Sequence, residues 1–186
     1  ADVTLAEQYR TAYEAWAKEV GAGKTERPAI PIGHREAPLV KMRSLDVDSH
    51  DGSLRLMRGW GSQNWLTNWT DLKSSMTWRI DVVEAGTFDF VLRYTCTPGD
   101  EGSKLRMEVG GQVIDVVLAE AFVPEIQAVP DRVLPRRGPP AQTWGTARLG
   151  TLELSAGPAQ LTLRAFTMPG HAVADVWSID ITRNPA

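Results

Sequence analysis

The chain has 186 residues and a formal net charge of -3, which fits one sizeable domain with its own core and gives no electrostatic basis for binding nucleic acid or an anionic membrane surface. No apolar run approaches the roughly 20 residues needed to span a bilayer. The single cysteine excludes an internal disulfide framework and any multi-cysteine metal site.

The first predicted element is an amphipathic helix over residues 4–20. A capping box formed by Thr4 and Glu7 marks its start, and glycines follow its end. Apolar side chains recur at helical spacing and include three aromatic rings: Leu5, Tyr9, Ala12, Tyr13, Trp16 and Val20. We expect so large an apolar stripe to dock, either on the rest of this chain or on a domain that the chain does not contain.

Prolines and glycines punctuate the segment that follows the helix. Pro28, Pro31, Pro38, Gly23 and Gly33 fall in a stretch without helical or alternating pattern, which predicts a stiff, extended connector. We therefore divide the chain into a helix over 1–21, a linker over 22–40 and a β-domain over 41–184. The helix could be the end of a preceding catalytic domain.

The clearest pattern is the alternation of apolar and polar residues over 76–96. It predicts a β-hairpin with its turn at residues 84–86. A second hairpin is predicted over 151–165, with its turn at 155–159. Both segments favour an antiparallel β-sandwich.

Further short strands are separated by Gly, Pro and Asp residues. Gly110 and Gly111 are typical of a tight hairpin turn. The proline-rich stretch 122–144 is expected to be a long loop, where sandwiches tend to carry binding sites. The whole chain is therefore predicted to be an all-β, two-sheet antiparallel sandwich or jelly roll behind one helix. The predicted strands cover 39–42, 54–57, 64–68, 77–83, 87–95, 105–109, 112–118, 148–154, 160–165 and 174–182.

No catalytic motif is complete. The run Cys96-Thr97-Pro98 matches part of the Cys-x-Pro-x-Arg motif of type I sulfatases, but Asp100 replaces the arginine, so we expect an inert thiol at a strand end. The three histidines stand in separate segments without ligand spacing. We therefore expect this chain not to be an enzyme.

Tryptophans are the best candidates for a binding site. Indole faces stack on sugar rings, and amides such as that of Asn64 bind hydroxyl groups. Strand alternation places most of the rings in the core: Trp65, Trp69, Trp78 and Trp177. Two rings lie in loop-like, glycine-flanked contexts and are the candidates for stacking on sugar: Trp60 and Trp144.

Several stretches resemble carbohydrate-binding modules of families 6 and 35. They are the run 78–94 with its Ala-Gly turn, the segments 149–157 and 161–164, and the closing run 175–181. They are still more similar to the β-sandwich that follows the catalytic domain in some bacterial, planctomycete-like sulfatases. The helix and the segment from Arg27 to Gly33 look like the end of such a sulfatase.

This resemblance implies a galactose-binding-like jelly roll with an apical sugar site. In those modules the site uses loop aromatics and an Asn just before the last strand, and Trp144 and Asp175 occupy the comparable positions here. The resemblance also implies a structural calcium ion between carboxylates of the first and last strands, for which Asp46 and Asp180 are the candidates. No other cofactor is expected.

Our hypothesis is a non-catalytic, carbohydrate-binding module of a secreted or periplasmic, sulfatase-like enzyme. Its partners would be a glycan or polysaccharide, which could carry sulfate, and the parent catalytic domain. Arg136 and Arg137, with Arg132, have the geometry to bind sulfate groups. One alternative is a purely structural domain that packs against or dimerises the parent enzyme. Another is a fragment of an active sulfatase whose catalytic domain is missing from this chain.

Overall fold

The computed structural model describes residues 3–20, 27–58, 64–126 and 141–185. Strands dominate it behind one helix, which confirms the predicted all-β fold with an N-terminal helix. The elements in chain order are α1 (Val3–Glu19), β1 (Ile30–Ile32), β2 (Leu39–Arg43), the short 3-10 helix η1 (Ser44–Asp46), β3 (Ser49–His50), β4 (Arg55–Arg58), β5 (Asn64–Thr67), β6 (Ser75–Val82), β7 (Gly86–Thr95), β8 (Ser103–Val109), β9 (Gln112–Leu118), β10 (Gly145–Leu154), β11 (Gly157–Thr167) and β12 (Asp175–Arg183).

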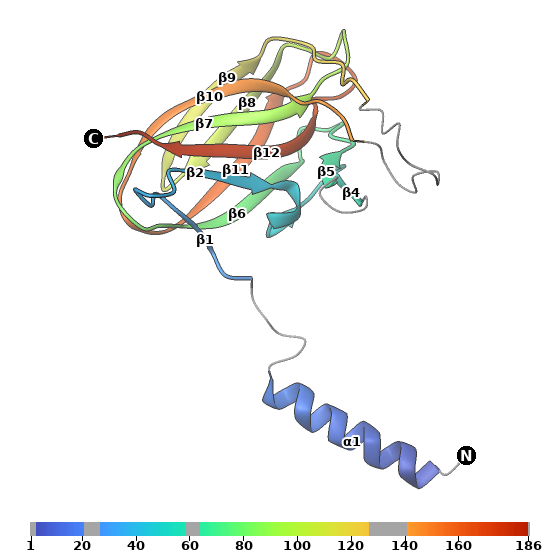
Figure 1. Cartoon of the computed structure of the whole chain (residues 1–186). Helices are drawn as coiled ribbons and strands as arrows, with labels where there is room; N and C mark the ends of the chain where they lie inside the picture. Colours follow the sequence, from blue (N-terminus) through green and yellow to red (C-terminus); the bar gives the residue numbers. More distant parts are fainter. Residues whose placement is uncertain (1–2, 21–26, 59–63, 127–140, 186) are drawn as a thin grey trace, which may run out of the picture.

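Two sheets pack face to face (Figure 1). In the first, here called sheet A, the strand order is β1-β6-β11-β8-β9, and β3 also pairs with β6. In the second, sheet B, the order is β10-β7-β12-β5-β4, and β2 also pairs with β12. The pairs are antiparallel except β1 with β6, which run parallel.

The prediction of two long hairpins is wrong. Strand β6 belongs to sheet A and β7 to sheet B, and likewise β10 lies in sheet B and β11 in sheet A. Each predicted turn is therefore a crossing from one sheet to the other. The hairpin at Gly110 and Gly111 is confirmed, because β8 and β9 pair from Val109 opposite Gln112 onward.

The alternation of apolar and polar residues nevertheless predicts the buried positions of both strands correctly. Trp78 and Ile80 of β6 and Phe88 and Phe90 of β7 are all fully buried, and they face one another from opposite sheets. Burial of each large apolar side chain contributes about 1.5–3 kcal/mol. The two strands are thus held together by the core between the sheets and not by a ladder of hydrogen bonds.

The sandwich also begins earlier than predicted. Strand β1 lies inside the expected linker, and Ile30 pairs with Ile80 of β6. Ile32 is fully buried. A strand with Pro31 at its centre is tolerated here because β1 is an edge strand and needs no hydrogen bond from that position on its outer side.

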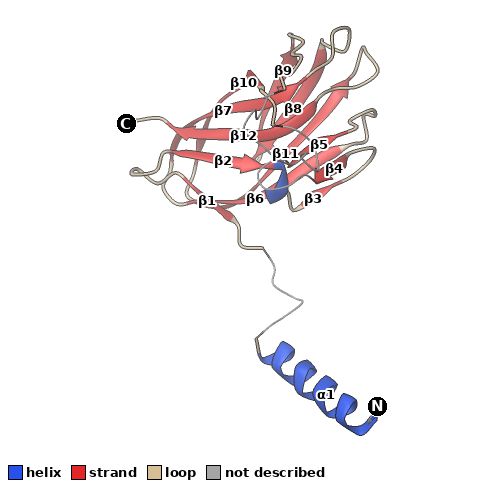
Figure 2. Cartoon of the chain, turned by 45° about the vertical axis from the view of Figure 1, so that its right-hand side comes forward, coloured by secondary structure: helices blue, strands red, loops and turns tan. Residues whose placement is uncertain are grey.

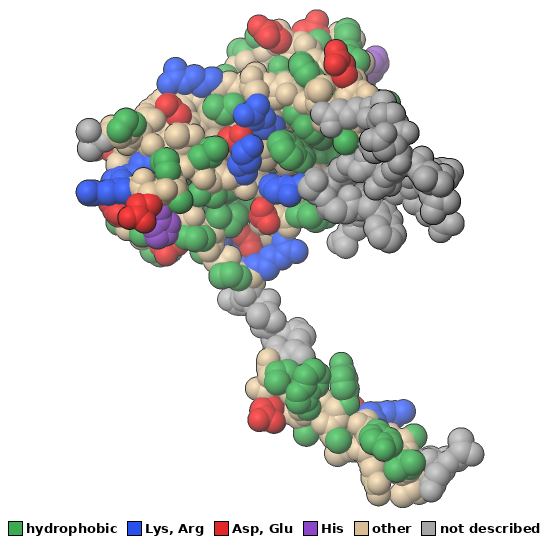
Figure 3. Space-filling model, in the orientation of Figure 1, with side chains coloured by type: hydrophobic (Ala, Val, Ile, Leu, Met, Phe, Trp, Pro, Cys, Tyr) green, Lys and Arg blue, Asp and Glu red, His purple; other side chains and the backbone are tan. Residues whose placement is uncertain are grey.

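The apolar stripe of α1 does not pack on the sandwich. Tyr9, Tyr13 and Trp16 are 70%, 63% and 55% exposed. Figures 1 and 2 show the helix standing apart from both sheets, and Figure 3 shows the hydrophobic side chains along it. Among the described residues, no helix is long and apolar enough to cross a membrane.

Candidate functional site

Three tryptophans meet at one end of sheet B. Trp65 lies on β5, Trp177 on β12, and Trp144 immediately precedes β10. The Trp144 and Trp177 rings are stacked, with centroids 5.8 Å apart and an interplanar angle of 11°. Trp65 contacts Trp144 edge to face at 5.5 Å. We call these three residues the indole cluster.

A β-bulge explains why Trp177 belongs to this cluster. Along β12, Val176 pairs with Tyr94 of β7, but the next residue of β7, Arg93, pairs with Ser178. Trp177 is the extra residue, and such a residue is re-aimed out of the regular alternation. Its ring is therefore half-buried against Trp144, and its predicted place in the core is wrong.

Close packing fixes the chain around Trp144. Gly145 follows it, and a side chain at this glycine would lie 2.7 Å from the Phe122 ring, so only glycine fits. One residue before Trp144, the Thr143 N–H donates a hydrogen bond to the Glu125 carbonyl at 3.0 Å. The Thr143 hydroxyl accepts one from the Glu125 N–H at 2.9 Å. Trp144 is thus held on both sides by segment 122–125.

Asp175 supplies an acceptor beside the indoles. Burial raises the pKa of its carboxyl group, and the Thr67 hydroxyl and the Asn68 backbone N–H oppose this shift by hydrogen bonding to the charged form. The Trp65 indole also favours the charged form, but its nitrogen makes no hydrogen bond of good geometry. Trp65 therefore presents a buried N–H without a partner among the described residues.

Basic residues of β2 border the other side of Trp177. The Arg43 guanidinium lies 5.5 Å and the Lys41 ammonium 5.9 Å from the centre of its ring, within the range of a cation–π interaction. On the same face, Asp180 is 4% exposed. Its carboxylate accepts a hydrogen bond from Arg93 Nε at 3.0 Å and another from the Ser178 hydroxyl at 2.8 Å.

The predicted sugar-binding residues are distributed unevenly. Trp144 and Asp175 both lie at the indole cluster, whereas Asn64 is buried on β5 next to Trp65. Trp60, Arg132, Arg136 and Arg137 lie outside the described residues. Sequence reasoning missed Trp65 and Trp177 as site residues because it assigned both to the core, and a bulge leaves no local sequence signal.

The predicted calcium ligands, Asp46 and Asp180, make other interactions in the structure. Asp46 is exposed and accepts a hydrogen bond from the Arg43 backbone N–H at 2.9 Å. Both carboxylate oxygens of Asp180 are already bound, one of them by a guanidinium. Calcium takes six to eight oxygen ligands, and the described part of the chain contains no group of three or more potential ligands among His, Cys, Asp and Glu.

Cys96 has the properties of a structural thiol. It is buried, and burial, followed by the charges of Asp100 and Glu101, raises its pKa to about 11. The thiolate, which is the reactive form, is therefore scarce at neutral pH. This agrees with the expectation of an inert cysteine.

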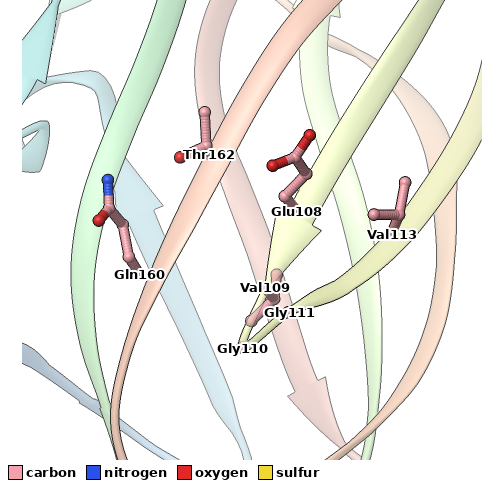
Figure 4. Close-up of a pocket in the computed structure, with 7 residues that line it drawn as sticks. All are labelled: Glu108, Val109, Gly110, Gly111, Val113, Gln160 and Thr162. Carbon is pink, nitrogen blue, oxygen red and sulfur yellow. The ribbon is translucent and has the colours of Figure 1, made fainter.

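A hollow lies on the outer face of sheet A, beside the turn at Gly110 and Gly111 (Figure 4). It has a volume of about 280 Å³ and is lined by Glu108, Gln160 and Thr162 together with Val113. It contains no aromatic ring, and Glu108 is paired with Arg164 at 3.0 Å. Its chemistry is less suited to a sugar than that of the indole cluster.

Comparison with solved structures finds β-sandwich modules among the similar folds, in agreement with the two-sheet arrangement of this chain. A family 35 carbohydrate-binding module from Clostridium thermocellum aligns with a TM-score of 0.54 and 14% identity, over 78% of this chain and 98% of its own. The C-terminal family 6 module of the laminarinase LamC from Zobellia galactanivorans aligns with a TM-score of 0.53 and 16% identity, over 78% and 99%.

A larger enzyme contains a similar unit. The Podospora anserina mannanase, which joins a GH26 domain to a family 35 module, aligns with a TM-score of 0.55 and 13% identity. The alignment covers 80% of this chain and 28% of the mannanase. The matches also include the mosquito-larvicidal Cry4Aa toxin from Bacillus thuringiensis, so the likeness shows the fold alone. No family model and no curated protein matches the sequence.

Proposed function

We propose that this chain is a non-catalytic carbohydrate-binding module whose ligand site is the indole cluster with Asp175. The observation that carries the proposal is the arrangement of three contacting indoles beside a carboxylate. Modules of families 6 and 35 are among its structural neighbours, which supports a carbohydrate-binding domain.

The chemistry of the site suits a sugar. The partly exposed ring of Trp144 would receive the apolar C–H face of a pyranose ring. Asp175 would accept hydrogen bonds from hydroxyl groups of the sugar.

The parent protein is a further part of the proposal. We propose that the module positions a sulfatase-like enzyme on a glycan outside the cytoplasm, on the sequence resemblance of α1 and the segment from Arg27 to Gly33. Finding a Cys/Ser-x-Pro-x-Arg motif in the coding region upstream would support this parent, and an unrelated upstream region would refute it. We expect the chain alone to have no activity on an aryl sulfate.

One observation favours the alternative of a structural domain. The exposed ring surface of Tyr9, Tyr13 and Trp16 is unusual for a helix in water. It fits a domain that packs on its parent or on a second copy. If the chain is dimeric by light scattering and Trp16→Asp makes it monomeric, the structural role is supported; a monomeric chain would contradict self-association through α1.

Calorimetric titration with neutral, carboxylated and sulfated polysaccharides tests the binding function. We expect saturable binding that Trp144→Ala abolishes, because the variant loses the central ring of the cluster. Trp16→Ala is the matched control, since it removes an equally large exposed indole far from the cluster. Equal affinity of Trp144→Ala and the unchanged chain, or no heat with any polysaccharide at millimolar concentration, would refute the proposal.

A further inference from the structure

The surface of the indole cluster continues onto the edge strand β4. This strand pairs with β5, so that Met57 lies opposite Trp65 and Arg55 lies opposite Thr67. Residues that lie opposite each other on neighbouring strands share one face of the sheet. Met57 and Arg55 therefore lie on the same face as Trp65, at the end of sheet B where β4 and β5 run side by side (Figure 1).

This face is the outer face of sheet B. Leu56 of β4 packs against the core, and its cross-strand partner Leu66 is part of the core. Successive side chains of a strand point to opposite faces. The next residues in the register, Met57 and Trp65, therefore point away from the core.

Strand β12 supplies further side chains to this face. Val176 of β12 pairs with Leu66 of β5 in an antiparallel register, which places Asp175 beside Thr67. The Thr67 hydroxyl forms a hydrogen bond with the Asp175 carboxylate, in agreement with this register. Two rows of side chains thus cross the strands: an apolar row of Trp177, Trp65 and Met57, and a polar row of Asp175, Thr67 and Arg55.

The β4 end of the apolar row is open to solvent. Met57 is 39% exposed, whereas Trp65, which contacts Trp144, is 7% exposed. From Trp177 on β12 to Met57 on β4 the row crosses two strand spacings, about 10 Å in all, which is longer than one pyranose ring. A methionine side chain is flexible and adapts to the surface that it contacts. The row therefore offers apolar contact to a second sugar beyond the one at Trp144.

The polar row ends in hydrogen-bond donors. Arg55 is exposed, and its Nη1 donates hydrogen bonds to the Leu54 carbonyl at 2.7 Å and the Gly52 carbonyl at 3.3 Å. Within the described part of the chain, Arg55 makes no ion pair and no further hydrogen bond. A guanidinium has five N–H donors, so several of them are available to hydroxyl groups of a ligand.

From these two rows we infer that the site binds an extended oligosaccharide across β12, β5 and β4, with one sugar at Trp144 and the next over Met57. Arg55 donates hydrogen bonds to hydroxyl groups of this second sugar. The inference rests on the proposed carbohydrate-binding function. It makes the edge strand β4 the part of the site that distinguishes a chain of sugars from a single sugar.

Short oligosaccharides test the length of the site. The probes are the one-sugar and two-sugar fragments of whichever polysaccharide binds most tightly among mannan, laminarin, pectin and carrageenan, measured by calorimetry. We expect the two-sugar fragment to bind at least fivefold more tightly than the single sugar, because contact with Met57 adds buried apolar surface to that at Trp144.

Three variants make the test specific to β4. Met57→Ala should weaken binding of the two-sugar fragment by about three- to tenfold, since it removes most of the apolar surface of this subsite. Arg55→Met keeps a long side chain but removes the donors, and it should weaken the same fragment by about two- to tenfold. Val117→Ala is the matched control, because Val117 is an exposed apolar residue on the edge strand β9 of sheet A. It should leave the affinity unchanged, and none of the three variants should change binding of the single sugar.

The outcomes separate this inference from the function on which it rests. Equal affinity for one and two sugars, or a loss in Met57→Ala no greater than that in Val117→Ala, would overturn the second subsite and leave carbohydrate binding intact. An unchanged affinity of Arg55→Met would remove Arg55 from the subsite. Failure of all four polysaccharides to bind would overturn both the subsite and the proposed function.

Discussion

The close approach of Gly145 to Phe122 gives the sharpest structural prediction. Replacing Gly145 with alanine adds one methyl group next to the buried start of β10. That methyl carbon would lie 2.7, 2.9 and 3.0 Å from Phe122 side-chain atoms, closer than non-bonded carbon atoms normally approach. The Phe122 ring or the β10 backbone must therefore move.

The expected cost follows from this overlap. Inserting a methyl group into a packed region costs about 1–3 kcal/mol. In a domain of this size, 1 kcal/mol corresponds to about 2–4 °C in Tm. Gly145→Ala should thus lower the Tm by roughly 2–12 °C. Because Trp144 precedes the glycine, the same variant should weaken glycan binding.

Urea denaturation followed by tryptophan fluorescence measures the loss of stability. Phe122→Ala in the Gly145→Ala background removes the overlapping ring, so the two substitutions should be less than additive by about 1 kcal/mol or more. An unchanged urea midpoint for Gly145→Ala would refute the reasoning. Full additivity in the double variant would show that Phe122 is not the obstacle.

Three further predictions follow from the described residues. Burial raises the pKa of the Cys96 thiol to about 11, so folding favours the protonated thiol. The stability that this thiol contributes is therefore lost as the pH rises from about 9 to 11. Cys96→Ala should reduce the fall of the urea midpoint over this range, and an identical fall in both proteins would contradict the assignment. The predicted calcium pair is tested by the Tm in millimolar calcium, which should stay unchanged if Arg93 and Ser178 keep the Asp180 carboxylate; a rise in Tm that Asp180→Asn removes would support the calcium pair. Deleting residues 1–26 should leave the Tm of the sandwich unchanged, since α1 stands apart from it, and a large decrease would show that the helix docks.

Much of the fold could be predicted from local patterns. The alternation of β6 and β7 correctly gives the buried positions of both strands. It could not give the partner of each strand, because an inward-facing side chain has the same pattern whether the next strand is its neighbour in one sheet or lies opposite in the other. The turn at 84–86 is short in both arrangements. Partner choice depends on distant segments, such as β11 beside β6 and β12 beside β7.

The candidate site was only half predictable for a related reason. Trp144 follows a proline-rich loop and precedes a glycine, so its local context indicates partial exposure. Trp177 stands in a regular strand pattern, and only the pairing of Val176 and Ser178 with β7 reveals the bulge that re-aims its ring. Strand β1 was missed because Pro31 is typical of a linker, although an edge strand tolerates it.

The most direct test of carbohydrate binding follows the indole N–H signals in a proton–nitrogen NMR spectrum while an oligosaccharide from a polysaccharide that binds the chain is added. Trp65, Trp144 and Trp177 should shift progressively and saturate together, whereas the fully buried Trp69 and Trp78 should remain in place. Saturable binding with unchanged signals from the indole cluster, or shifts confined to Trp16 on α1, would contradict the claim that this cluster is the carbohydrate-binding site.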